Sequence, residues 1–385
     1  MIMNTLLKWI VGIVIVVLIA WGGYVLYQKY SGSIDGGVAT GEPIKIGFIG
    51  ALTGDAAAYG EGARNTVALA VDEINKSGGV DGRPLEVVYE DGKCNGKDAA
   101  NAAQKLVNVD KVMVIFGGSC SGETLSAIPI VEVGKVVLVS GTATSPDLTG
   151  KSKFFFRTYP SDAKQGEIVA DAANAKGWKK VVAIQEQTDY ALGYYKAFEN
   201  RFKQLGGTVT KEEFATSVTD VRSLLTKLKN QKPDALLISV QTPAAGERIL
   251  KQLQDLKWKP ALIVIDILVN DTATVERNKE YLEGAIGADF ALDQNNQKLQ
   301  NFLAAYKAMF NADVPFTSYN TAVYDSVYVI KDGIMAVGLD GEKIADWSRT
   351  IKDWAGASGM ITIDANGDRA SAHSVKVVKD GKAQF

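Results

Sequence analysis

Two cysteines, Cys94 and Cys120, are the side chains of this 385-residue sequence best suited to covalent chemistry. Cys120 lies in the segment GSCSG at residues 118–122, a cysteine version of the nucleophile elbow G-x-S-x-G of some hydrolases. The same two residues are the whole cysteine content, and each is expected in a loop that follows a strand. An even number of cysteines in an exported protein favours a disulfide bond. Cys120 therefore has two interpretations, half of a disulfide or a nucleophile, and the disulfide is favoured.

A cysteine hydrolase would need an acid and a histidine after Cys120, and chain order permits Asp266 or Asp325 followed by His373. His373 is the only histidine, and it lies in the polar segment DANGDRASAHSVKVV, where we expect a solvated surface residue. We therefore predict no catalytic residues and no enzymatic activity.

No cofactor or metal motif is complete in this sequence. The segment GALTG at residues 50–54 follows the first expected strand, where a dinucleotide-binding protein would show G-x-G-x-x-G. The segment DANGD at 364–368 imitates the start of a calcium loop, but Arg369 stands at the required Gly position and Val375 at that of the bidentate Glu. We predict a hairpin turn there, no metal site and no cofactor.

The charge balance excludes nucleic acid as a partner. Lys and Arg number 42 and Asp and Glu number 44, so the formal net charge is −2. A chain that binds nucleic acid needs a basic excess to neutralise phosphates, and none is present.

The N-terminal segment predicts a membrane anchor. Residues 9–28 carry no charge and are long enough to span a bilayer. Bulky Trp21 and Tyr24 follow the most apolar part, where a cleavable signal peptide would have small residues. Residues 1–30 are therefore expected to form a single-pass anchor that holds the rest of the chain outside the cytoplasm. The Gly-rich segment 31–43 is expected to be a flexible linker.

Short apolar strands and amphipathic helices alternate from Ile44 onward, which predicts parallel sheets covered on both faces. The pattern restarts near residue 158. In the first unit we expect strands at 44–50, 85–89, 112–116 and 136–139, and helices at 59–76, 97–108 and 121–133. In the second we expect strands at 180–184, 208–214, 235–239 and 261–265, and helices at 162–175, 190–205, 220–230 and 244–256.

Two long helical stretches, 295–310 and 318–337, have no strand between them and are expected to return to the first unit. The prediction is an α/β protein with two doubly wound parallel-sheet lobes joined by a multi-strand hinge. The N-terminal lobe comprises 44–158 plus 290–356, and the C-terminal lobe comprises 159–289 plus 357–385. Ligands of such sheets bind beyond the carboxyl ends of the strands.

The sequence resembles the leucine/isoleucine/valine-binding protein family, the type I periplasmic solute receptors of branched-chain amino acid ABC transporters. The resemblance is carried by residues 50–91, by Cys94, by GGSCSGET at 117–124 and by VSGTATSPDLT at 139–149. It implies a Venus-flytrap receptor without cofactors, which binds an amino acid between its lobes and delivers it to an ABC permease in the membrane.

The resemblance also implies a place for the ligand carboxylate. The family holds it with a Ser directly after the second Cys and a Thr in the next loop, which are Ser121 and Thr144 here. Independently, Ser121 lies where a strand ends and a helix begins, so backbone N–H groups and the helix dipole favour an anion there. Thr142 stands where relatives often have Ala, and it is a further candidate contact.

For the ligand ammonium group, the resemblance implies Asp266, an acid in the loop after a second-lobe strand. Family aromatic residues that line the pocket match Tyr59 and Tyr190. A third, a Tyr in some relatives, falls near Gln241 or Thr242 here, and this departure favours "amino acid" over "leucine" as the ligand. A sensory ectodomain that acts through a partner is the alternative function on the same fold.

Overall fold

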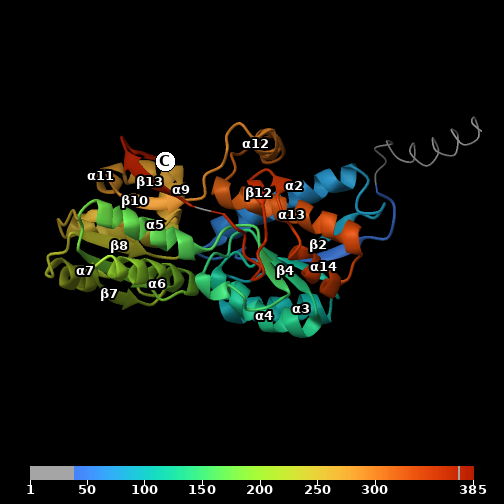
Figure 1. The fold of residues 1–385 in the computed structure, drawn as a ribbon, viewed down its shortest axis with the longest axis horizontal. Coiled ribbons are helices and arrows are strands. Elements are labelled where there is room, and N and C mark those ends of the chain that lie inside the picture. The colour runs from blue at the N-terminus through green and yellow to red at the C-terminus, as the bar shows by residue number, and fades with distance from the viewer. Residues whose placement is uncertain (1–38, 372) are drawn as a thin grey trace, which may run out of the picture.

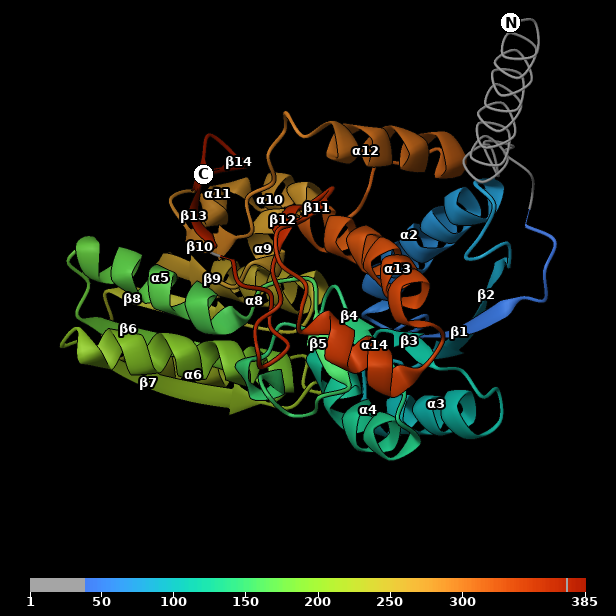
Figure 2. The same cartoon turned by 45° about the vertical axis from the view of Figure 1, so that its right-hand side comes forward.

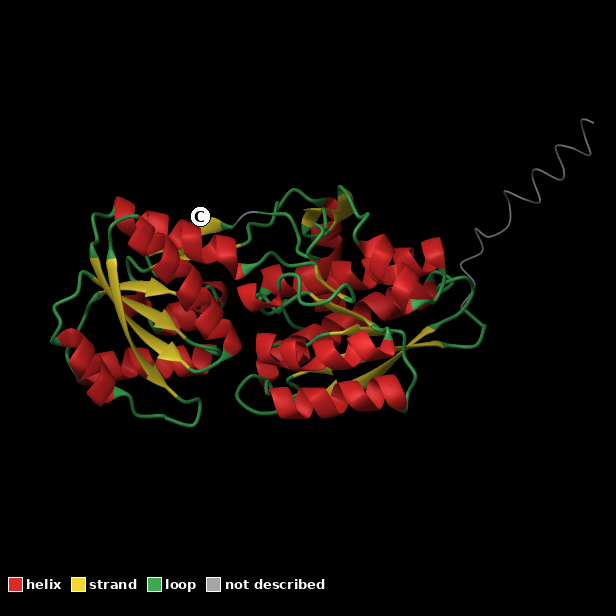
Figure 3. Ribbon diagram, turned by 60° about the horizontal axis from the view of Figure 1, so that its bottom comes forward, coloured by secondary structure: helices red, strands yellow, loops and turns green. Residues whose placement is uncertain are grey.

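The computed structural model describes residues 39–371 and 373–385 as two α/β lobes that lie side by side (Figure 1, Figure 3). The predicted membrane anchor at residues 1–30 lies outside the described residues, as does most of the predicted linker at 31–43. Within the described ranges, no helix combines the length and apolar character needed to cross a bilayer. The anchor therefore stays a prediction.

The first lobe is built on five strands, β1 (Ile44–Gly50), β2 (Leu85–Asp91), β3 (Val114–Phe116), β4 (Val137–Ser140) and β5 (Phe155–Arg157). They form a fully parallel sheet in the order β2-β1-β3-β4-β5. The strands are mostly apolar because helices cover both faces of the sheet, so neither face is left to water. The predicted parallel α/β character of this lobe is confirmed.

Helices lie on both faces of the first sheet (Figure 2). On one face, α2 (Ala57–Lys76), α13 (Thr317–Val337) and α14 (Gly341–Ser348) share a core with Phe48. On the other face, α3 (Gly96–Asn108) and α4 (Ser121–Gly134) share a core with Ile49. Neighbouring residues of one strand thus enter opposite cores, as the pleat of a strand requires.

The second lobe is built on seven strands, β6 (Lys180–Glu186), β7 (Thr208–Phe214), β8 (Ala235–Ser239), β9 (Ala261–Val264), β10 (Ile286–Asp289), β13 (Ser374–Lys379) and β14 (Lys382–Gln384). Their order is β14-β13-β10-β9-β8-β6-β7. The sheet is parallel from β7 to β10, but β13 and β14 add an antiparallel edge. Asp380 and Gly381, both at positive φ, make the tight turn between these last two strands.

Helix α5 (Asp162–Ala175) precedes β6, and α6 (Asp189–Gln204), α7 (Arg222–Lys229) and α8 (Pro243–Asp255) connect the parallel strands of the second lobe. They enclose one large core around Val182, Ile184 and Leu237. Three short helices follow β9, namely α9 (Ile267–Asn270), α10 (Thr272–Arg277) and α11 (Lys279–Leu282). The sequence did not predict these, because each is too short to show a helical period.

Within the described residues the chain passes between the lobes at 157–162, 289–297 and 361–374. The second passage leads to α12 (Gln297–Phe310) and α13, and the third follows β11 (Trp354–Gly356) and β12 (Gly359–Ile361). Ile361 and Ile363 pack in the first lobe's core. The lobe boundaries stay a proposal, and this packing favours a last boundary after Ile363 rather than after residue 356.

In the C-terminal passage between the lobes, one prediction is confirmed and another is wrong. Residues 364–368 form the predicted hairpin turn, closed by a bridge between Ile363 and Arg369. His373, expected to be a solvated surface residue, is only 5% exposed, so that expectation is wrong. The polar composition around it misled the prediction, because this segment runs between the lobes, where the imidazole lies 6.0 Å from the ring of Tyr159.

Candidate ligand-binding site

A cleft of about 310 Å³, including the part open to solvent, lies between the two lobes. Both lobes contribute to its lining, which consists of Tyr59, Ser119, Cys120, Ser121, Thr142, Tyr190, Gln241, Ile267 and Tyr319. Five of the seven residues predicted to bind a ligand are in this lining. The other two, Thr144 and Asp266, are fully buried behind it. Ligand contact by all seven stays a prediction.

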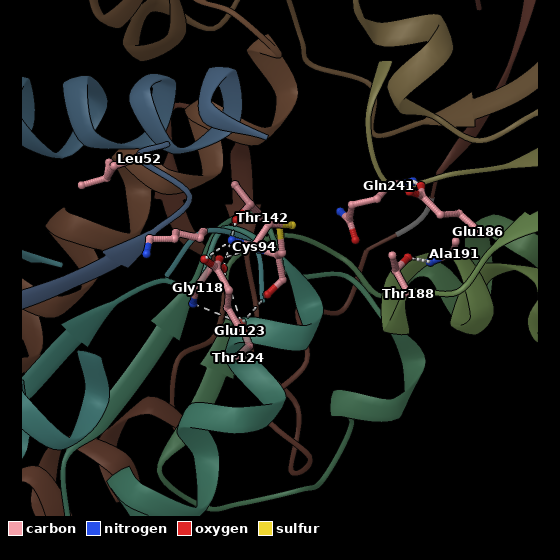
Figure 4. The surroundings of a disulfide bond; sticks show 12 residues. Leu52, Cys94, Gly118, Glu123, Thr124, Thr142, Glu186, Thr188, Ala191 and Gln241 are labelled. Atoms are coloured by element: carbon pink, nitrogen blue, oxygen red, sulfur yellow. Dashed lines mark hydrogen bonds between the residues drawn. A yellow bond between two sulfur atoms is a disulfide. The ribbon is translucent and has the colours of Figure 1, made fainter. Parts of the chain in front are cut away.

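The cleft lies where loops leave the carboxyl ends of parallel strands, as expected for open α/β sheets. Ser121 follows β3 and Thr142 follows β4 in the first lobe, while Tyr190 follows β6 and Gln241 follows β8 in the second. Figure 4 shows Gln241 facing across the gap toward the side that holds Thr142. The topology thus brings together side chains that are far apart in the sequence.

Local capping fixes the second-lobe side of the cleft. Thr188 begins α6, where its hydroxyl accepts a hydrogen bond from the Ala191 N–H over 3.2 Å. Thr242 begins α8 in the same way. Since Thr242 is committed to its own helix, Gln241 is the one of the two predicted alternatives that lines the cleft.

Cys94 and Cys120 form a disulfide bond, with their Cα atoms 5.4 Å apart (Figure 4). The disulfide interpretation is confirmed, and the hydrolase alternative is wrong, because a thiol in a disulfide is not a free nucleophile. The bond ties the loop after β2 to the N-terminus of α4. It therefore holds in place the loop that carries Ser119 and Ser121.

Glu123 links the same two cysteine loops through hydrogen bonds to their backbone. Its carboxylate accepts hydrogen bonds from the Cys120 N–H over 2.8 Å and from the Cys94 N–H over 2.9 Å. Burial raises the pKa of Glu123 to about 7, and the backbone donors oppose that rise. Nothing in the sequence motif marks this acid except its place three residues into the helix, where a capping box has Glu.

Ser121 is at the first position of α4 and is 1% exposed. Its hydroxyl oxygen accepts a hydrogen bond from the Ser145 N–H over 3.1 Å, so Ser121 also joins the loops after β3 and β4. The hydroxyl proton remains available to a ligand. Together with the positive end of a 14-residue helix, this arrangement suits a carboxylate.

Thr144 lies behind the lining, and its hydroxyl donates to the buried carboxylate of Asp162 over 2.7 Å. Burial raises the pKa of Asp162 well above its usual value, and the Asp266 carboxylate adds to the rise. The loop is also held by Arg157, whose guanidinium donates to the carbonyl oxygens of Ala143 and Ser145 over 3.3 and 3.0 Å. Thr144 thus supports the floor of the cleft in this structure.

Asp266 is fully buried directly behind the second-lobe side of the cleft. Its carboxylate accepts hydrogen bonds from the hydroxyls of Tyr190 and Tyr319, two residues of the lining. Burial raises the pKa of Asp266 to about 6, although both tyrosine hydroxyls oppose the rise. An ammonium group in the cleft would therefore lie close to a carboxylate that is held in place by two hydroxyls of the lining.

Sequence reasoning missed four lining residues: Ser119, Cys120, Ile267 and Tyr319. Ser119 and Cys120 are the two residues before the predicted Ser121, and Ile267 directly follows the predicted Asp266, so all three could have been found by extending those loops. Tyr319 carried no such signal, because it lies near the start of α13, a helix that returns to cover the first lobe.

The chain is similar over most of its length to proteins of known type. A sequence model described as periplasmic binding protein matches residues 43–382. The Leu/Ile/Val-binding protein BraC3 of Rhizobium johnstonii is 30% identical over 334 residues, covering 85% of this chain and 89% of that protein.

Solved structures with a similar fold include the leucine-binding protein LivK of Thermotoga maritima. Its TM-score is 0.81 at 29% identity, and the match covers 89% of this chain and 97% of that one. The branched-chain amino acid transporter substrate-binding protein LivJ of Streptococcus pneumoniae, solved in complex with isoleucine, has a TM-score of 0.79 at 28% identity. That match covers 89% of this chain and 98% of the other.

Proposed function

The chain belongs to the periplasmic binding protein family, among the Leu/Ile/Val-binding proteins, and we propose that it binds an amino acid in the cleft between its two lobes. The observation that carries this proposal is the lining itself, in which Ser121 of the first lobe lies across the cleft from Tyr190 of the second. A carboxylate-binding group and an ammonium-binding group thus stand on opposite walls of one small cleft.

The proposed contacts follow from the chemistry of each wall. The Ser121 hydroxyl and the N-terminus of α4 hold the ligand carboxylate, since both offer donors to an anion. Asp266, reached beside the Tyr190 and Tyr319 hydroxyls, attracts the ammonium group. Tyr59, Thr142 and Gln241 surround the rest of the ligand. Thr144 supports the loop rather than contacting the ligand directly, because its hydroxyl is committed to Asp162.

Ligand binding would stabilise the closed arrangement of the lobes, because each half of the site comes from a different lobe. A permease that recognises the closed form could then distinguish loaded from empty protein, since the ligand changes the population of that form. An ABC permease is the partner we propose. The disulfide supports a location outside the cytoplasm, where thiols are oxidised.

Thermal unfolding of the purified full-length protein against the twenty standard amino acids tests this proposal. A ligand at 100 times its Kd should add about 2.7 kcal/mol to the unfolding free energy. Asp266→Asn, which keeps the shape of the side chain, should remove most of the shift. If no amino acid raises the midpoint, the proposed ligand class is wrong.

A further inference from the structure

Two hydroxyl groups in the cleft lining are buried without a hydrogen-bond partner among the described residues. They belong to Tyr59, which is 9% exposed, and Ser119, which is 8% exposed. A buried hydroxyl that has lost water and gained no partner destabilises the fold, so such groups are rare unless they have a function. Burial raises the pKa of Tyr59 well above its usual value, so this phenol keeps its proton and can donate it.

The lining as a whole combines polar groups with aromatic rings. Seven of the nine lining residues carry a hydroxyl or an amide, and Ile267 is the one aliphatic side chain among them. Ser119 and Thr142 also line a smaller cavity of about 230 Å³ that extends into the first lobe, where its wall is mainly apolar and includes Phe48, Phe116 and Val323. Among the lining hydroxyls, those of Tyr59 and Ser119 are therefore the ones that a ligand side chain could supply with a missing partner.

We infer that the ligand is an amino acid whose side chain is neutral and forms hydrogen bonds, a hydroxyl or a carboxamide, and that this group partners Ser119 and Tyr59. This inference rests on the proposed function, because it assumes that an amino acid occupies the cleft. An aliphatic side chain would leave both hydroxyls buried without partners, which is the arrangement that gives binding sites their strongest discrimination.

A cationic side chain fits less well, because the acids near Tyr59 already have partners. Glu186 accepts a hydrogen bond from the Gln241 N–H over 2.7 Å. Asp271 accepts hydrogen bonds from Thr274 and lies 3.9 Å from the guanidinium of Arg277. Asp266 is the acid reserved for the ligand ammonium. An acidic side chain is disfavoured by all three carboxylates, which lie close enough to raise the Tyr59 pKa.

Titration calorimetry with the full-length protein tests the inference in one panel. The probes are serine, threonine, asparagine and glutamine, then leucine, isoleucine and valine, then lysine and glutamate. The expected result is that at least one probe of the first group binds about tenfold or more tightly than every other probe. If an aliphatic or charged amino acid binds most tightly, the inference is overturned while the proposed function stands. If none of the probes binds, the inference is overturned, and the unfolding test with all twenty amino acids decides the proposed function separately.

Two variants with a matched control then test the named hydroxyls. Ser119→Ala and Tyr59→Phe should each weaken the best polar ligand about 5- to 100-fold, because each removes one hydrogen bond to it. Neither should lower the unfolding midpoint of the unliganded protein, since each removes an unpartnered buried group. Tyr194→Phe is the control, because the Tyr194 hydroxyl is also buried and unpartnered but lies outside the lining.

The control should leave ligand affinity unchanged. Unchanged affinity in both Ser119→Ala and Tyr59→Phe would show that the two hydroxyls do not contact the ligand, and this would overturn the inference. A loss of affinity as large in Tyr194→Phe would do the same, because the effect would then come from the packing of the second lobe.

Discussion

The hydroxyl of Ser145, in the first lobe, donates a hydrogen bond to the backbone carbonyl oxygen of Asp189, in the second lobe, over 3.2 Å. This bond lies beside the cleft, because Ser145 also donates its N–H to Ser121. Two ion pairs join the lobes elsewhere, between Lys196 and Asp147 at 3.9 Å and between Arg248 and Asp55 at 3.7 Å. The structure thus holds the two lobes in contact around the site.

Gly193→Ala should disturb this contact without disturbing either lobe. A Cβ atom on Gly193 would lie 2.6 Å from the Ser145 hydroxyl and 2.9 Å from the Pro146 Cδ, both in the opposite lobe. Inside α6 the same change favours the helix by about 0.5 to 1 kcal/mol. We expect ligand affinity to fall about tenfold, which calorimetry measures, while the midpoint of unliganded unfolding stays the same or rises.

Gly166→Ala is the matched control for that prediction. Its new Cβ atom would lie 2.6 Å from the Ala197 Cβ and 2.7 Å from the Phe198 nitrogen, both within the second lobe. Overpacking of this kind should lower the free energy of unfolding by about 1 to 3 kcal/mol. Equal loss of stability in both variants would contradict the assignment of Gly193 to the interface between lobes.

Ligand affinity should depend on pH through Asp266. Its pKa is about 6 because of burial, so below that pH the carboxyl is largely neutral and attracts an ammonium group weakly. Affinity should therefore rise as pH increases from 5 to 7 and then level off, with about one proton released per ligand near pH 5. Calorimetry in two buffers of different ionisation enthalpy measures that proton. A flat profile between pH 5 and 7 would contradict a role for Asp266 in binding.

The disulfide between Cys94 and Cys120 should contribute to stability. The two residues are 26 positions apart, and the chain-entropy model gives about 3 to 4 kcal/mol for a loop of that length. Cys94→Ala combined with Cys120→Ala should lower the free energy of unfolding by about this amount in urea titrations. Thiol counting under denaturing conditions provides the check, with no free thiol before reduction and two after it.

Much of the fold could be predicted from the sequence, because its main elements are long and strongly patterned. The bounds of β1, α5, β7 and β8 agree with the predicted ranges residue for residue. Strand β5 escaped prediction, since three residues show no reliable period and its pairing with β4 depends on tertiary contacts. The antiparallel edge formed by β13 and β14 was also missed, although its Asp-Gly turn was a readable hairpin signal.

The site was predictable as far as topology determines it. Loops that follow parallel strands converge, which favoured Ser121 as part of a cleft, while Thr142 and Gln241 were predicted from the family resemblance. The direction of a side chain could not be predicted in the same way. The sequence therefore did not indicate that Thr144 lies behind the lining. The two unpartnered hydroxyls could not be predicted either, because the absence of a hydrogen bond depends on the position of every neighbouring atom.

The buried ion pair between Arg157 and Asp368 should be essential for stability. Arg157 is fully buried, and its Nε lies 2.8 Å from a carboxylate oxygen of Asp368 in the C-terminal hairpin turn. Asp368→Asn would leave a buried guanidinium without its counter-charge, at a cost of about 3 to 5 kcal/mol in urea unfolding.

The control for Asp368→Asn is Asp72→Asn. Asp72 pairs with Lys76 over 2.8 Å on the surface of α2, where the side chains of Lys76 and Asp72 are 74% and 36% exposed. Loss of this pair should change stability by less than about 1 kcal/mol. Equal changes in the free energy of unfolding for the two substitutions would show that the buried pair contributes no more to stability than the surface pair.

His373 should titrate far below the ordinary range of histidine. Burial lowers the pKa of its imidazole to about 4; the nearby Asp289 charge opposes this shift and the Arg157 charge adds to it. Because this is the only histidine of the chain, its ring resonances in a proton NMR spectrum need no assignment by mutation. A midpoint near 6.5 would show a solvated ring and contradict the buried position.

The same shift gives His373 a defined effect on stability. The folded protein favours the neutral ring, so this contribution is fully present above about pH 6.5 and is lost as pH falls toward 4. Burial of Asp266 acts in the opposite sense, because a raised carboxyl pKa stabilises the fold at low pH. The difference in unfolding free energy between wild type and His373→Asn isolates the histidine, and it should grow with pH between 4 and 6.5. A difference that does not change over that range would mean that the ring is not held in its neutral form.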